Sequence, residues 1–144
     1  MNKLLAIGAI ALLLCAAAVA SEKTIPQLKA EVETAKQKDQ PKLYAAIAEL
    51  EMQQAERLFN SGDVQKGQAA ISDTTVDSEN AAKAAIESRK RMKETEISLR
   101  KISERMENLA RSVEFESQGP IKSAVERIEQ ARNSLLNAMF KKKS

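Results

Sequence analysis

The chain has 144 residues, which fits one domain, and 23 Lys and Arg residues nearly balance 20 Asp and Glu residues at a formal net charge of +3. It contains no His, no Trp, one Cys, one Tyr and three Phe. These counts argue against a histidine-based metal site or general base and against a base-stacking platform, so we expect no metal, no cofactor, no small-molecule substrate and no nucleic-acid partner.

Residues 1–20 have the pattern of a signal peptide. Lys3 gives a positive start, residues 4–14 are an apolar run, and Ala18-Val19-Ala20 matches the small-x-small pattern that precedes a cleavage site, here before Ser21. An uncleaved membrane span and a lipid anchor on Cys15 are the alternatives; the anchor is disfavoured because leucines, not a small residue, precede the cysteine. We therefore expect an exported, periplasmic protein, with full secretion as the alternative, whose mature domain of residues 21–144 has no cysteine and no disulfide.

Prolines and glycines divide the mature chain into predicted helices. The helices are expected at 26–37, 41–60, 63–116 and 120–140, because each of the three prolines stands where a helix can begin and residues 60–63, Asn-Ser-Gly-Asp, suit a turn. Thr24 and Gln27 match a capping box for the first of them. The predicted fold class is all-α.

The third helix is predicted to be unusually long. From Val64 to Val113, apolar or small residues recur at alternating steps of three and four, which predicts a continuous rod of roughly 75 Å with coiled-coil-like packing. A kink at 73–78 is the alternative, because those residues are poor helix formers. We expect elongated antiparallel hairpins or a bundle around this central helix, with the second helix on residues 64–85, the last on 99–113 and the first against 85–97.

The helix–helix contacts of the second half are predicted from the same spacing. They are Leu99, Ile102, Met106, Leu109, Val113, Ile121, Val125, Ile128, Leu135 and Met139.

Residues 55–69 resemble the turn of a single tetratricopeptide-like helical hairpin. The glycine-acid pair Gly62-Asp63 lies between two helical segments, and Gly67 and Ala69 follow where such repeats place a small residue. The mature chain is also similar to alanine-rich helical domains of unknown function in exported bacterial envelope proteins. The resemblance implies a hairpin but not a solenoid or its peptide-binding function, because no second copy occurs at a period of roughly 34 residues.

Charge is unevenly distributed along the mature chain. Residues 21–82 are net acidic and residues 83–144 are net basic, and the densest basic segment is 89–93. Such a segment is typical of a solvated helix face, of a contact with an acidic partner or of a contact with anionic lipid. The candidate partner or lipid contacts are Arg89, Lys90, Arg91, Lys93, Lys141, Lys142 and Lys143.

The functional expectation is a non-catalytic adaptor or structural spacer in the bacterial cell envelope, acting through a protein partner or self-association by helix burial. One alternative is a peripheral protein that docks weakly on an anionic membrane surface through its basic residues. Another is an extracytoplasmic helical chaperone, which would have an open apolar groove. Catalytic residues are not predicted: Glu126 and Glu129 share a helix face as in di-metal bundles, but those sites also need histidines.

Overall fold

The computed structural model describes residues 22–141, which form five α-helices and no strand. The helices are α1 (Ile25–Thr34), α2 (Gln40–Asn60), α3 (Val64–Ser88), α4 (Met92–Ser112) and α5 (Phe115–Phe140). The prediction of an all-α fold is confirmed. The predicted signal peptide of residues 1–20 lies outside the described residues. Within 22–141, no helix combines the length and the apolarity that a membrane crossing requires.

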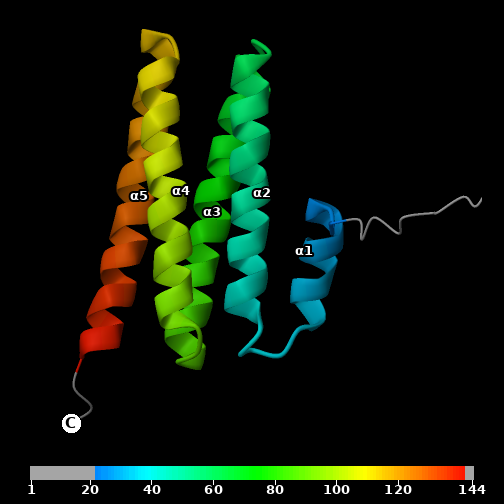
Figure 1. Ribbon diagram of the computed structural model, residues 1–144, viewed down its shortest axis with the longest axis vertical. Helices are drawn as coiled ribbons and strands as arrows, with labels where there is room; N and C mark the ends of the chain where they lie inside the picture. Colours follow the sequence, from blue (N-terminus) through cyan, green and yellow to red (C-terminus); the bar gives the residue numbers. More distant parts are fainter. Residues whose placement is uncertain (1–21, 142–144) are drawn as a thin grey trace, which may run out of the picture.

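Helices α2 to α5 form a bundle in which each helix runs antiparallel to the next along the chain (Figure 1). The α2–α3 hairpin packs on the α4–α5 hairpin, with α2 against α4 and α3 against α5. Helix α1 is shorter and packs on the outer side of α2 (Figure 1). The second and last helices therefore fold back on residues 64–85 and 99–113, as predicted.

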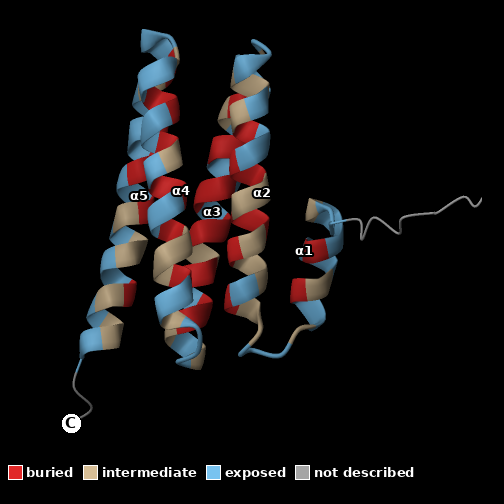
Figure 2. Ribbon diagram, in the orientation of Figure 1, coloured by how far each residue is buried: buried red, intermediate tan, exposed pale blue. Residues whose placement is uncertain are grey.

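The core lies along the inner faces of the four long helices (Figure 2). Its largest fully buried apolar side chains are Met52, Leu99, Ile102, Met106, Ile121 and Ile128, joined by alanines of α2, α3 and α5. The small alanines allow the α3 backbone to approach its neighbours closely, and the long side chains fill the space between the two hairpins. Of the predicted helix–helix contacts, all are buried except Val113 and Met139, which are half-buried.

The prediction of one helix over 63–116 is wrong. Helix α3 ends at Ser88, α4 begins at Met92, and Arg89 and Arg91 between them have positive φ angles of 58° and 56°. In a single rod, α2 and α5 would cover separate halves and stay apart, whereas the hairpin lets the α2–α3 pair pack on the α4–α5 pair, so that each pair buries a second apolar face. The chain reverses at its densest basic segment because those charges must stay in water.

The predicted turn at residues 117–120 is also wrong. The chain bends at Val113 and Glu114, both extended, and α5 begins at Phe115 with Pro120 inside it. The earlier start places Ser117 and Ile121 one turn apart on the buried face. Gln68 of α3 donates a hydrogen bond of 3.3 Å to the Ser117 carbonyl, which holds this first turn on the bundle.

The placement of α1 is corrected, whereas residues 73–78 are helical as the main prediction has them. Helix α1 ends at Thr34 and packs on the Ile47 side of α2 through Leu28 and Val32, not against 85–97, because α2 carries a second apolar stripe there. Residues 73–78 are helical within α3, without a break. The hydroxyls of Thr74, Thr75 and Ser78 donate 2.7–2.8 Å hydrogen bonds to carbonyls four residues earlier, so these poor helix formers are satisfied inside the helix.

The hairpin arrangement makes a distance prediction. Spin labels at exposed Gln65 and Arg111 would lie roughly 70 Å apart in one continuous helix, but these residues lie at the same end of the bundle (Figure 1). We expect pulsed electron spin resonance on a Gln65→Cys and Arg111→Cys chain to give a distance below about 30 Å. Since residues 21–144 contain no cysteine, only these positions are labelled. A distance near 70 Å would contradict the hairpin.

Candidate functional site

The predicted basic contacts lie at one end of the bundle. Arg89, Lys90 and Arg91 form the α3–α4 turn, Lys93 lies in the first turn of α4, and all four are exposed. Lys141, also exposed, follows α5 directly, and the Arg89 guanidinium donates a 3.2 Å hydrogen bond to the Ala138 carbonyl of α5. The two basic segments are therefore neighbours although some 50 residues separate them. Lys142 and Lys143 lie outside the described residues.

Three further lysines belong to the same end and were missed by the sequence reasoning. Lys36 and Lys38 lie in the α1–α2 connection and Lys42 in the first turn of α2, all exposed. The connection and the α3–α4 turn lie at the same end of the bundle (Figure 1), and Lys42 and Arg91 line one hollow between α2 and α4. We call residues 35–42, 87–94 and 138–141 the basic end. Its composite nature depends on the topology, which the linear sequence does not display.

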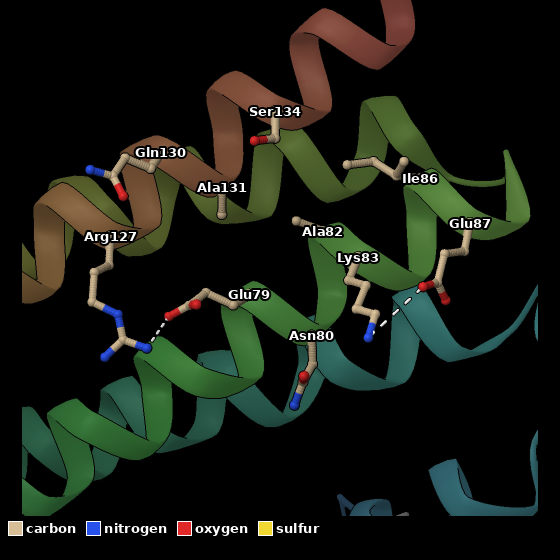
Figure 3. Close-up of a pocket in the computed structure, with 10 residues that line it drawn as sticks. All are labelled: Glu79, Asn80, Ala82, Lys83, Ile86, Glu87, Arg127, Gln130, Ala131 and Ser134. Atoms are coloured by element: carbon tan, nitrogen blue, oxygen red, sulfur yellow. Dashed lines mark ion pairs between the residues drawn. The ribbon is translucent and has the colours of Figure 1, made fainter.

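A groove runs along the outer side of the bundle between α3 and α5. Its volume is about 570 Å³, and its floor is formed by Ala82 of α3 and Ala131 of α5, with Ile86 and Ser134 on its walls (Figure 3). The groove is open between Ala82 and Ala131 because both side chains are small, and the longer side chains that line it, such as Lys83 and Gln130, stand at its edges (Figure 3). The apolar surface that the groove offers an incoming segment comes mainly from the half-buried Ile86 and Ala131, because Ala82 is only 3% exposed.

Ion pairs line the rim of this groove. Arg127 of α5 pairs with Glu79 of α3 across one part of the groove, and Lys83 lies 3.9 Å from Glu87 along α3 (Figure 3). The rim therefore carries two positive and two negative groups in alternation. These are partly exposed and easily rearranged, so they can exchange partners with charges on an incoming surface at small cost.

A second polar cluster connects α1 to the bundle. The Lys29 ammonium of α1 lies 3.1 Å from Oε1 of Glu51 on α2 and 3.9 Å from Oδ2 of Asp77 on α3. Glu51 is only 2% exposed. Its removal from water, and then the hydrogen bond that its protonated form gives Asp77, raise the pKa of Glu51 to about 8, against the opposing effect of Lys29. The cluster thus favours the protonated form of Glu51 over the form that the same group would have in water.

Further ion pairs join α2 to α4 and α4 to α5. Arg105 of α4 makes a two-pronged contact with Glu56 of α2, at 2.9 and 2.8 Å, and Arg132 of α5 binds Glu96 of α4 at 2.6 Å and Glu129 at 2.8 Å. Such paired geometry fixes the register of the hairpins. These groups are committed to the architecture, and we assign them no role in binding.

The remaining acidic residues form no obvious ion site. Within residues 22–141, no group of three or more His, Cys, Asp or Glu side chains is placed to hold a metal ion. In comparisons with known proteins, no family model, no curated protein and no solved structure matches this chain.

Proposed function

We propose that this chain is a non-catalytic, exported helical bundle that binds a protein partner in the bacterial cell envelope. Export is inferred from the signal-peptide pattern of residues 1–20. The observation that carries the binding role is the open α3–α5 groove, with its alanine floor and charged rim. An adaptor or spacer needs such a surface, and the groove provides it on a rigid scaffold.

An amphipathic helix is the partner element that this groove fits best. The bundle already holds one such helix on an outer side, because α1 buries Leu28 and Val32 on α2 and directs Lys29 to two carboxylates of the bundle. The α3–α5 side offers the same combination of apolar floor and charged rim without a covering helix among the described residues. Binding of a helix in a groove is a common mode of peptide recognition.

The floor and rim specify the chemistry of the incoming helix. Since Ala82 and Ala131 form the floor, medium-sized apolar residues such as Leu or Val could pack closely there. The alternating rim of Glu79, Lys83, Glu87 and Arg127 favours a helix with flanking charges of both signs. A second copy of this chain is the competing occupant, because its own helix faces have this pattern.

Site-specific photo-crosslinking tests this proposal. A photoreactive amino acid at Ser134, on the groove wall, should form an adduct with a distinct envelope protein in the native cell, and the crosslinked peptide should belong to an amphipathic helix. The matched control is Ser123, which is exposed on α5 outside the groove. Ser134→Arg should abolish the adduct formed from a probe at Lys83, while Ser123→Arg should leave it intact.

The outcomes separate the proposal from its rivals. Adducts only between copies of this chain would replace the partner by self-association. Equal crosslinking from Ser123 and Ser134 would show that the groove is not a binding surface. Captured unfolded segments of many proteins, without a common helix, would favour a chaperone over an adaptor.

A further inference from the structure

We propose that the basic end of the bundle docks on the surface of an anionic phospholipid bilayer. This inference rests on other residues than the α3–α5 groove does, and Glu87 is the one residue that the two surfaces share. Four observations carry it. Basic segments converge at this end, and their basic side chains make no ion pair with a carboxylate of the described chain. Two arginines have an unusual backbone conformation, and one phenylalanine at this end is exposed.

The basic end has a marked excess of positive charge. Its described residues include eight basic side chains and only three acidic ones, Asp39, Glu87 and Glu94. The opposite end, residues 57–67 and 107–119, has three basic and four acidic residues. The field along the bundle is therefore polarised, and its positive pole would orient the protein toward an anionic surface.

Seven of the eight basic side chains make no ion pair and no side-chain hydrogen bond within the described chain. All eight are exposed, and none makes an ion pair with a described carboxylate, although ten such pairs involve residues elsewhere in the described chain. Only Arg89 makes a side-chain hydrogen bond, to the Ala138 carbonyl. Free cations next to a bilayer with anionic lipid each contribute to adsorption without first breaking an internal contact.

Two of these cations occupy backbone positions that favour glycine. Arg89 and Arg91 lie in the left-handed region, with φ 58° and 56°, on either side of Lys90. A non-glycine residue in this region costs about 1 kcal/mol. The α3–α4 turn therefore has arginine where glycine would be more stable, which agrees with a use for the charge outside the fold.

An exposed phenylalanine completes the surface. Phe140 is 77% exposed and directly precedes Lys141 at the basic end. An aromatic side chain among cations is the combination that suits the headgroup region, where the ring enters the boundary with the acyl chains and the cations contact phosphates. The other highly exposed phenylalanine, Phe115 at 84%, lies at the opposite end of α5 and provides an internal control.

A lipid surface fits these features better than an acidic protein or a nucleic acid. The charged residues belong to the α1–α2 connection, the α3–α4 turn and the end of α5, and these segments lie at one end of the bundle rather than along one helix face (Figure 1). Such a surface matches many mobile phosphates without fixed register. Docked in this way, the bundle would stand on the bilayer, and its 26-residue α5 would extend about 39 Å from the headgroups.

Vesicle co-sedimentation tests the inference, using the chain from Ser21 because residues 1–20 would insert into lipid by themselves. Within residues 22–141, every buried hydrophobic side chain lies between residues 28 and 135, so this chain retains the folded bundle. We expect binding to phosphatidylcholine vesicles that contain roughly 30% phosphatidylglycerol and no binding to pure phosphatidylcholine. Raising the salt from about 50 to about 500 mM should reduce the bound fraction more than tenfold.

The decisive variant is the double substitution Arg89→Gly and Arg91→Gly. Glycine fits both backbone positions, which offsets the loss of the hydrogen bond from Arg89 to the Ala138 carbonyl, so the melting temperature should change little, whereas the partition coefficient should fall about 25-fold with the loss of two charges. Phe140→Ser should weaken binding five- to tenfold, because the serine side chain has no apolar ring to bury at the membrane boundary. Phe115→Ser should have no effect.

Three results would overturn the proposal. One is the absence of sedimentation with the anionic vesicles at low salt, even if the basic end captures an acidic protein or a nucleic acid. A second is equal binding to neutral vesicles. The third is equal loss of binding with Phe115→Ser and Phe140→Ser, because the contact would then not be made by the basic end.

Discussion

Replacing Glu51 with Gln is expected to raise the free energy of unfolding by on the order of 3 kcal/mol at pH 9, but by only about 1 kcal/mol at pH 5. Glu51 is 2% exposed in the folded bundle, and its pKa rises from 4.5 to about 8. Between these values the folded protein keeps a proton on Glu51 that the unfolded chain has lost. Raising the pH through this window therefore reduces stability, and glutamine, always neutral, removes the reduction.

The neighbouring charges belong to three helices. Lys29 of α1 stabilises the ionised form of Glu51, and Asp77 of α3 opposes it; Asp73 of α3 acts on Lys29 from a greater distance. The pKa of Lys29 is itself raised, chiefly by its hydrogen bond to Glu51, so its contribution is lost only in strongly alkaline solution. Considering the described groups of this cluster, we therefore expect the free energy of unfolding to fall as the pH rises from 5 and to level off near pH 9.

Urea denaturation at pH 5, 7 and 9 measures this difference. Glu104→Gln on α4 is the matched control, because Glu104 is exposed and its substitution should shift all three midpoints equally. If the stabilities of the wild-type and Glu51→Gln proteins ran parallel across the three pH values, Glu51 would titrate as an ordinary carboxyl group, and the described cluster would have no energetic role.

The sequence was sufficient to predict which residues face the core. The steps of three and four placed Ile71, Leu99, Ile102 and Met106 on buried faces, and the structure confirms each. Periodicity reports the face of a helix that is turned inward, and this does not depend on where the helix ends. The same spacing failed at residues 89–91, because a turn of three residues can leave the alternation of steps unbroken.

The basic end and the surroundings of Glu51 could not be predicted from the sequence. The basic end assembles Lys38, Arg91 and Lys141 from three segments, and only the directions of the helices bring them together. The sequence showed the excess of positive charge in residues 83–144. It did not show that lysines from the acidic half of the chain join the same end. Likewise, Glu51 stands in α2 between apolar neighbours, and only the packing of α1 and α3 explains how a buried carboxyl group is tolerated there.

Truncation of a side chain should affect α1 and the four-helix core differently. Ile128 is fully buried between the hairpins, so Ile128→Ala should lower the global free energy of unfolding by about 3–4 kcal/mol. Leu28 belongs instead to the small cluster between α1 and α2. Because a helix of ten residues is marginal by itself, Leu28→Ala should release α1 as a unit and leave the urea midpoint of the bundle nearly unchanged.

Hydrogen exchange separates these two effects. In the Leu28→Ala protein, amides of α1 should lose most of their protection while those of α4 and α5 keep theirs; in the Ile128→Ala protein, protection should fall throughout the bundle. Release of α1 also exposes Glu51 to water, so the Leu28→Ala protein should lose most of the decline in stability between pH 5 and pH 9. If the stability of the Leu28→Ala protein fell between pH 5 and pH 9 as much as that of the wild type, α1 would not be what shields Glu51 from water. The burial of this carboxyl group would then be due to the α2–α3 contact alone.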